Sequence, residues 1–219
     1  MTSPRAYVFD AYGTLFDVHS AAARYRTDIG ASWERMSQLW RTKHLEYTWI
    51  HAQTGRHMRF WTLAERSLDY AIAATGGVPA GVRDKLLEAY LTLSAYPEVP
   101  GVLAALRRNG TRLAVLTNGD PDMIDNAVRS AGLEGLLNAV ITVHEAGVFK
   151  PDRRVYALAT DRFGLAPADI SFQSSNRWDI AGAKVFGMRC VWINRTGAPD
   201  EYPEMAPDQV AKDLTALTG

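Results

Sequence analysis

Short apolar runs typical of buried β-strands recur along most of this 219-residue chain. Each run is rich in β-branched, aromatic or other apolar residues and is followed by turn residues and then by a helical pattern. Strands that alternate with helices in this way predict a parallel sheet covered by helices. The predicted strands are residues 5–9, 112–117, 138–142, 170–174 and 189–193.

The segment between Leu15 and Pro97 differs, because it holds helical patterns and no convincing strand. Turns with Gly and Pro separate three helical stretches. The chain is therefore predicted to form an α/β core domain, residues 1–15 and 98–219, with a helical cap domain, residues 16–97, inserted after the first strand. The predicted cap helices lie within 32–53, 59–75 and 82–93, and the Pro-rich stretch 197–208 predicts a surface connection before a last short helix.

Polar residues follow four of the five predicted strands, at the edge of the sheet where open α/β folds bind ligands. They include two carboxylates and a lysine, and the others carry hydroxyl or amide groups. In chain order they are Asp10 and Thr14, then Thr117, Asn118 and Gly119, then Lys150, and finally Ser174, Ser175, Asn176 and Asp179.

Each of these residues also has an ordinary structural explanation. Asp10 could cap a turn, and the sequence TNGD around Asn118 is common before a helix that starts near Pro121. Lys150 could be a solvated lysine at a helix entry, and Asp179 could favour the positive end of a helix. All of them together, in this order at strand ends, predict a catalytic site.

Composition excludes several classes of partner. The 24 basic residues balance 24 acidic ones, and no long basic run is present, so we expect no binding to nucleic acid or to a membrane surface. The single cysteine, Cys190, lies in an apolar run and cannot form an intrachain disulfide. No apolar run is long enough to span a bilayer, and the N-terminus does not read as a signal peptide. We therefore expect a cytoplasmic protein.

Four motifs at the strand ends resemble those of the haloacid dehalogenase superfamily, and specifically of its L-2-haloacid dehalogenases. They are FDAYGTLFD at 9–17, LTNG at 116–119, FKPD at 149–152 and SSNRWDIAGAKVFG at 174–187. The stretch LWRTKHLEYTWI, residues 39–50, looks like the helical cap of those enzymes. The resemblance implies a Rossmann-like parallel-sheet core with an inserted all-helical cap. It also implies hydrolysis of short 2-haloalkanoic acids to 2-hydroxy acids, with inversion, through an aspartyl ester.

Tyr12 stands where phosphatases of this superfamily carry a second Asp, which protonates a leaving alkoxide. A halide needs no proton to leave, and Asn176 occupies the stretch where magnesium-dependent relatives offer acidic ligands. We therefore expect no metal ion, no cofactor and a displacement at carbon. A magnesium-dependent phosphatase or phosphonate hydrolase of the same superfamily, or a catalytically silent binding member, remain alternatives.

The resemblance also implies a role for each catalytic residue. Asp10 would be the nucleophile, and Asp179, helped by Asn176, would activate the water that hydrolyses the ester. Lys150 would keep the Asp10 carboxylate ionised, because an ammonium beside a carboxylate favours its charged form. The hydroxyl groups around these charges would be those of Thr14 and Ser174.

Substrate contacts are implied in the same way, by residues from both domains. Arg41 and Asn118 would face the halide, and Thr117 differs from the Ser that is frequent in the family. This substitution, together with Ala11 in place of a larger apolar residue, leaves the natural haloacid open. The substrate carboxylate is assigned to Thr117 and the backbone N–H groups of Ala11, Tyr12 and Asn118, with Tyr156 at the border, and the alkyl group to Leu45, Phe60 and Trp178.

A homodimer is expected from the family likeness and from the many aromatic residues of the cap. The same residues could equally belong to the interior of the cap. They include Trp33, Trp40, Trp49 and Trp61.

Overall fold

The computed structural model describes residues 3–218 and has a parallel sheet at its centre. Six strands lie in the order β3-β2-β1-β4-β5-β6, and all neighbouring strands are parallel. The first five confirm the strands that the apolar runs predict. Their bounds are β1 Ala6–Phe9, β2 Arg112–Thr117, β3 Ala139–Thr142, β4 Ile170–Ser174 and β5 Arg189–Ile193.

The sixth strand, β6 Gln209–Ala211, lies after the Pro-rich connection, where no apolar run predicts a strand. It is three residues long and lies at the edge of the sheet, where Gln209 and Val210 are exposed. A strand this short and polar has no apolar run to mark it. The predicted last short helix is a turn of 3-10 helix, η6 Leu214–Leu217.

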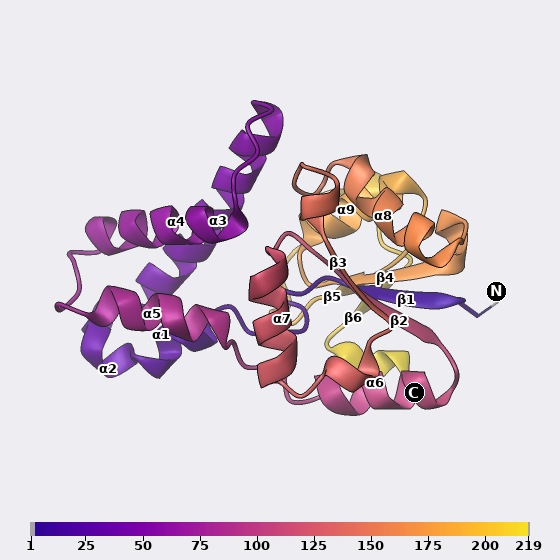
Figure 1. Ribbon diagram of the computed structural model, residues 1–219, viewed down its shortest axis with the longest axis horizontal. Coiled ribbons are helices and arrows are strands. Elements are labelled where there is room, and N and C mark those ends of the chain that lie inside the picture. Colours follow the sequence, from indigo (N-terminus) through magenta and orange to yellow (C-terminus); the bar gives the residue numbers. More distant parts are fainter. Residues whose placement is uncertain (1–2, 219) are drawn as a thin grey trace.

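Helices cover the sheet on both sides (Figure 1). In this view α8 and α9 lie above the strands, and α6 and η6 lie below them. Both faces of the central strands are therefore buried, which explains why β2 and β4 read as continuous apolar runs. The core helices are α6 Val99–Arg108, α7 Pro121–Ser130, α8 Arg153–Phe163 and α9 Arg177–Phe186, with short 3-10 turns η2 Glu134–Leu136, η3 Val143–Glu145, η4 Pro167–Asp169 and η5 Pro203–Met205.

The inserted segment is helical, and it lies to one side of the core in Figure 1. Its two longest helices, α3 and α4, pack against each other, and the Trp40 indole N–H donates to the Ala64 carbonyl at 2.9 Å. Trp40 therefore belongs to the interior of the cap. The cap helices are α1 Ser20–Arg24, α2 Arg26–Ile29, η1 Gly30–Ser32, α3 Trp33–Gln53, α4 Phe60–Ala74 and α5 Val82–Leu91.

Two neighbouring segments connect the cap with the core. The backbone N–H of Asp17 donates to Ser94 O at 2.9 Å, and that of Tyr96 donates to Leu15 O at 3.0 Å. The segment that leaves the core and the segment that returns to it therefore lie side by side. The exact division at 15/16 and 97/98 stays a prediction, but these hydrogen bonds fix the cap at the carboxyl end of β1, beside the polar strand ends.

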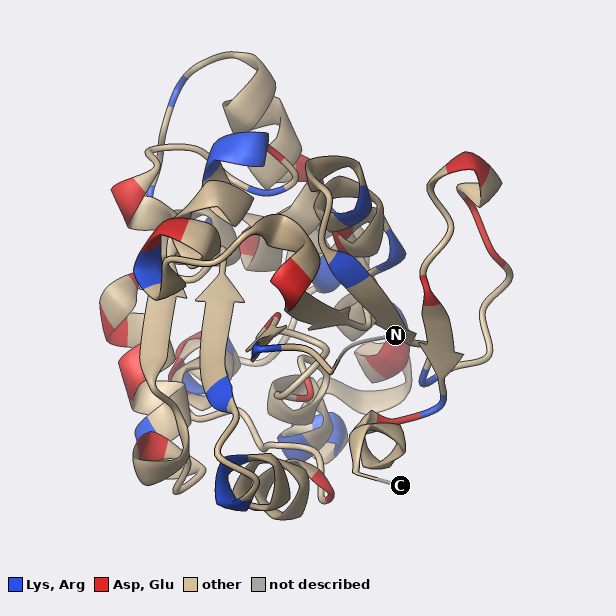
Figure 2. Cartoon of the chain, turned by 90° about the vertical axis from the view of Figure 1, so that its right-hand side faces the viewer, with Lys and Arg blue, Asp and Glu red and all other residues tan. Residues whose placement is uncertain are grey.

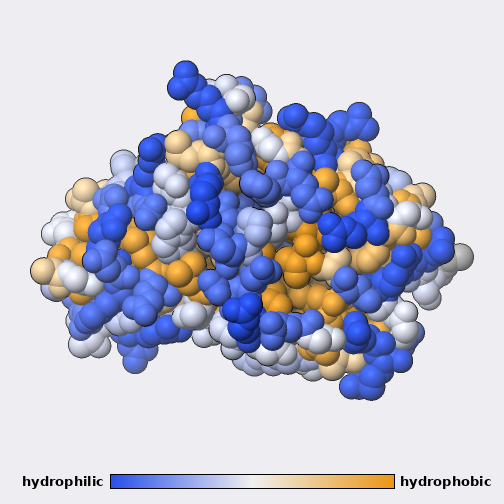
Figure 3. All heavy atoms as spheres, in the orientation of Figure 1, coloured by the Kyte–Doolittle hydropathy of each residue, from blue (hydrophilic) through white to orange (hydrophobic). Residues whose placement is uncertain are grey.

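The surface carries mixed charge and scattered apolar groups. Figure 2 shows Lys and Arg interspersed with Asp and Glu around the chain. On the face drawn in Figure 3, hydrophobic atoms gather over part of the core domain between hydrophilic ones. No helix within residues 3–218 is both long and apolar enough to cross a membrane.

Candidate active site

The carboxyl ends of β1 and β4 bring a buried cluster of polar side chains together. Asp10 directly follows β1, and its backbone N–H donates to Gln173 O in β4 at 2.9 Å. Because the two strands are parallel and in register, Asp10 lies beside Ser174. Thr14 completes this wall from the turn after β1, and all three side chains are buried.

The Asp10 carboxylate is held by four side-chain donors. Its Oδ2 accepts from Asn176 Nδ2 at 2.8 Å, from Thr14 Oγ1 at 2.9 Å and from Ser174 Oγ at 3.4 Å. Its Oδ1 accepts from Lys150 Nζ at 3.1 Å. Donors on both oxygens fix the plane of the carboxylate, as a nucleophile that must attack in line requires.

Lys150 bridges two carboxylates inside the protein. Its Nζ lies 3.1 Å from Asp10 Oδ1 and 2.8 Å from Asp179 Oδ2, and its side chain is 1% exposed. Burial alone would lower the pKa of Lys150, but the two carboxylates outweigh it and raise that pKa. Lys150 is therefore a cation at neutral pH.

Asp179 lies in the first turn of α9 and is fully buried. Burial raises its pKa to about 6, while Lys150 opposes the shift and the negative charge of Asp10 adds to it. Tyr156 donates its hydroxyl hydrogen to Asp179 Oδ1 at 2.7 Å, with the Asp179 carbonyl at 3.1 Å. A carboxylate with a pKa near neutrality suits a general base.

Tyr156 lies beneath the site and not at its open border. It is completely buried, and its ring contacts Phe172 and Phe186. Gly182 makes room for it, since a Cβ there would lie 2.5 Å from the Tyr156 hydroxyl oxygen. The structure thus links Tyr156 with Asp179, a contact between α8 and α9 that the sequence does not reveal.

Arg41 reaches the cluster from the cap helix α3. Its Nη2 donates to Tyr12 O at 3.0 Å and to Asn176 Oδ1 at 3.2 Å. Asn176 in turn donates to Asp10, so a guanidinium from the cap is two hydrogen bonds away from the carboxylate. The side chain is half-buried, and it lines a cavity of about 320 Å³ together with Gly13 and Asn176.

The loop after β2 supplies buried polar groups on the other side of the cluster. Thr117 Oγ1 accepts from Gly119 N at 3.0 Å, and Asn118 Oδ1 accepts from Lys150 N at 2.9 Å. A Cβ at Gly119 would lie 2.8 Å from the Tyr12 ring, so only glycine fits there. Asn118 therefore positions the backbone of Lys150, and this contact is independent of any contact with a ligand.

Aromatic residues from both domains cover the cluster. Tyr12 stacks on Tyr90 of α5, with 5.8 Å between ring centroids, and lies 5.4 Å from Phe60. Burial raises the pKa of Tyr12 well above its usual value, so its phenol stays protonated at neutral pH. Ala11 is buried beside it, and Leu45 follows Arg41 by one turn of α3.

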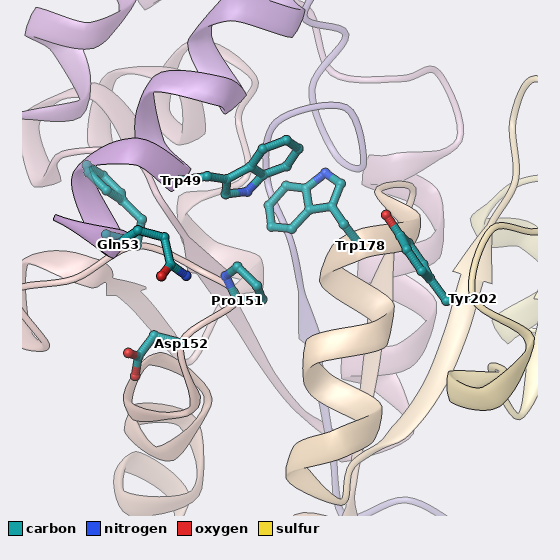
Figure 4. Close-up of a pocket in the computed structure, with 8 residues that line it drawn as sticks. Trp49, Gln53, Pro151, Asp152, Trp178 and Tyr202 are labelled. Carbon is teal, nitrogen blue, oxygen red and sulfur yellow. The ribbon is translucent and has the colours of Figure 1, made fainter.

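Trp178 lies at the mouth between the cap and the core (Figure 4). Its ring meets Trp49 of α3 edge to face, with 5.6 Å between centroids. Both rings line a pocket of about 480 Å³ together with Phe149 and Pro151, the neighbours of Lys150 in sequence. A pocket with several aromatic side chains thus lies between the cap and the core, beside the residues that flank Lys150.

Two residues that contact this region belong to no motif in the sequence. His44 is buried against Phe60, with 3.9 Å between ring centroids, and its Nε2 lies 3.1 Å from Phe60 O. Asp120 is buried at the start of α7 and contacts α4. Each contact joins two different elements, and no local motif in the sequence marks such a contact.

No group of three or more His, Cys, Asp or Glu side chains is placed to hold a metal ion in the described chain, residues 3–218. The carboxylates of Asp10 and Asp179 share the Lys150 ammonium as their counter-charge. Metal independence stays a prediction, and the chemistry of this donor set is consistent with it.

Comparison with known proteins places this geometry in a family. The model of haloacid dehalogenase-like hydrolases matches residues 4–187. (S)-2-haloacid dehalogenase 1 of Pseudomonas sp. (strain CBS-3) is 44% identical over 90% of this chain and 88% of its own length. Haloacetate dehalogenase H-2 of Moraxella sp. (strain B) is 38% identical over 99% and 97%.

A solved structure agrees with these relatives. The L-2-haloacid dehalogenase of Xanthobacter autotrophicus with chloropropionic acid covalently bound superposes with a TM-score of 0.87, at 36% identity over 98% of this chain and 97% of that one. The expected α/β core with its helical insertion is thereby confirmed. The chain belongs to the L-2-haloacid dehalogenase family of the haloacid dehalogenase-like hydrolases.

Proposed function

We propose that the protein hydrolyses short (S)-2-haloalkanoic acids to 2-hydroxy acids with inversion at the carbon. The observation that carries this proposal is the Asp10 carboxylate, buried at a strand end and held by Lys150 and three neutral donors. Relatives at about 40% identity that are named as (S)-2-haloacid dehalogenases support it.

In the first step Asp10 attacks the carbon that bears the halogen, from the side opposite the halogen. A carbon–oxygen bond forms, the carbon–halogen bond breaks, and the halide leaves with the bonding electron pair. Arg41 offers a cation that can meet this developing charge, and Asn118 is the second residue proposed to face the halide. Thr117 and the backbone N–H groups after β1 and β2 would receive the substrate carboxylate.

In the second step a water attacks the carbonyl carbon of the Asp10 ester. Asp179 takes a proton from that water, and the proton passes to the oxygen of the departing 2-hydroxy acid. The second proton of the water is released to solvent, so Asp10 returns as a carboxylate that holds one oxygen from the water. The carbon is inverted once, in the first step, and the second step leaves its configuration unchanged.

The phosphatase alternative has less support. Tyr12 occupies the place of the phosphatase acid, and its buried phenol has a pKa well above the ordinary value. It is therefore a poor proton donor for a leaving alkoxide. Halide release from a panel of short 2-haloacids, measured with a chelator present, separates the two reactions, because a magnesium-dependent enzyme would lose its activity.

The covalent step can be tested by one turnover with enzyme in excess in heavy-oxygen water. The label should enter Asp10 and leave the product nearly unlabelled, and Asp10→Asn should abolish steady turnover. Asp84→Asn, at an exposed carboxylate of α5, is the matched control and should turn over normally. Label found directly in the product, or a product of retained configuration, contradicts the ester route.

We also propose a cytoplasmic homodimer. Exposed apolar residues on the cap support an interface there, since Trp49 is 37% and Ile50 56% exposed on α3, and Tyr70 is 44% exposed on α4. Cys190 is buried as a free thiol, which suits a reducing compartment. A stable monomer in sedimentation at working concentration would end the dimer proposal.

A further inference from the structure

Asp120 is the N-cap residue of α7 in the core, yet its side chain does not cap that helix. Its two oxygens accept instead from the first backbone N–H groups of α4 in the cap, from Phe60 N to Oδ1 at 3.2 Å and from Trp61 N to Oδ2 at 2.9 Å. The residue before α4, Arg59, supplies no side-chain cap of its own. The carboxylate of Asp120, in the core, thus caps the N-terminus of α4, a helix of the cap domain.

Charge supports this contact. A carboxylate is favourable at the positive N-terminal end of a helix, and more so when it is largely removed from water. The Asp120 side chain is 9% exposed. Arg59 lies over it, with Nε 3.4 Å from Asp120 Oδ2, and pairs through Nη2 with both oxygens of Asp122 at 2.7 and 2.8 Å.

Phe60 connects the contact between Asp120 and α4 to the candidate active site. Phe60, the first residue of α4, has its N–H held by Asp120 and its carbonyl held by His44 Nε2 at 3.1 Å. Its ring lies 5.4 Å from Tyr12 and 6.2 Å from Phe149, the neighbour of Lys150. Figure 1 shows α7 beside the cap. The hydrogen bonds of Asp120 to Phe60 N and Trp61 N place it where the two domains meet.

Asp120 also directly follows Thr117, Asn118 and Gly119 in the chain. One loop of the core therefore carries groups that line the site and the carboxylate that holds α4. We propose that Asp120 is a positioning residue that couples this loop to α4 and so sets Phe60 as the wall for the alkyl group of the substrate. The role of Phe60 rests on the proposed function, whereas the structural coupling does not.

Kinetics test the role. In Asp120→Ala we expect the KM for 2-chloropropionate to rise about fivefold, because the start of α4 loses its N-cap and the Phe60 wall binds ground and transition states alike. The KM for chloroacetate, which has no alkyl group, should rise much less. Asp120→Asn, which keeps one acceptor, should recover part of the loss. Asp122→Ala, which removes only the exposed partner of Arg59, should match the wild type.

Hydrogen exchange tests the coupling itself. Amides at the start of α4 should exchange faster in Asp120→Ala than in Asp122→Ala, while those of α8 stay unchanged. Equal loss of affinity for both substrates, unchanged exchange in α4, or faster exchange throughout the chain each overturn the proposal. If the wild type releases no halide, the proposed function fails, and the exchange measurement still decides whether Asp120 holds α4.

Discussion

Removal of the Tyr156 hydroxyl should shift the pH dependence of turnover. Tyr156 donates to Asp179 Oδ1 at 2.7 Å, and both side chains are completely buried. In Tyr156→Phe the ring keeps its contacts with Phe172 and Phe186, so the packing survives and only the hydrogen bond is lost. Because that bond favours the ionised form of Asp179, the pKa of Asp179 should rise in the variant.

The size of the shift follows from the strength of the bond. A hydrogen bond to a charged group contributes about 1.5–3 kcal/mol, and one pKa unit corresponds to about 1.4 kcal/mol. Lys150 remains beside Asp179 in the variant, so we take the lower end, about one unit. At the pH where wild-type kcat is half its maximum, about a tenth of Asp179 would then be ionised, and kcat should be about fivefold lower.

The assay is halide release from about pH 5 to pH 9, with kcat and kcat/KM fitted separately. Asp179 acts after the halide has left, so the shift should appear in the acid limb of kcat and not in that of kcat/KM. Tyr70→Phe, at an exposed tyrosine of α4, is the matched control and should leave both limbs in place. An acid limb of kcat that stays or moves to lower pH in Tyr156→Phe would refute the role given to Asp179.

Two further predictions concern residues of the cap. Arg41→Lys should lower kcat by about tenfold or more, which corresponds to about 1.4 kcal/mol, because the planar guanidinium meets the charge that develops as the halide leaves. The loss should be larger for chloride than for bromide substrates. An unchanged kcat for both substrates would place the halide elsewhere. Burial lowers the pKa of His44 to about 3 in the folded protein. Below about pH 6.5 the unfolded chain therefore binds a proton on this histidine that the folded protein does not bind, and the free energy of unfolding decreases as the pH falls. Between about pH 7.5 and pH 5, urea unfolding should show the wild type losing about 2 kcal/mol more than His44→Gln, and equal losses would contradict this.

The sequence predicts those parts of the structure that depend on neighbouring residues. Five strands were found because each is an apolar run, and Asp10 and Lys150 were found because they follow strands whose ends must meet at one edge of a parallel sheet. β6 was missed because two of its three residues are exposed. The contact between Asp120 and α4 joins residues about sixty positions apart, and hydrophobic periodicity carries no information on it.

The arrangement of charge suggests why the two chemical steps follow each other. In the resting site one ammonium, Lys150, lies between the carboxylates of Asp10 and Asp179, and the charge of Asp10 helps to raise the pKa of Asp179. When Asp10 becomes an ester, its negative charge leaves with the halide, and Lys150 is left with Asp179 as its carboxylate partner. The pKa of Asp179 must then fall below its resting value of about 6, so a larger fraction of it is ionised once there is an ester to hydrolyse. Formation of the intermediate therefore prepares the base that removes it.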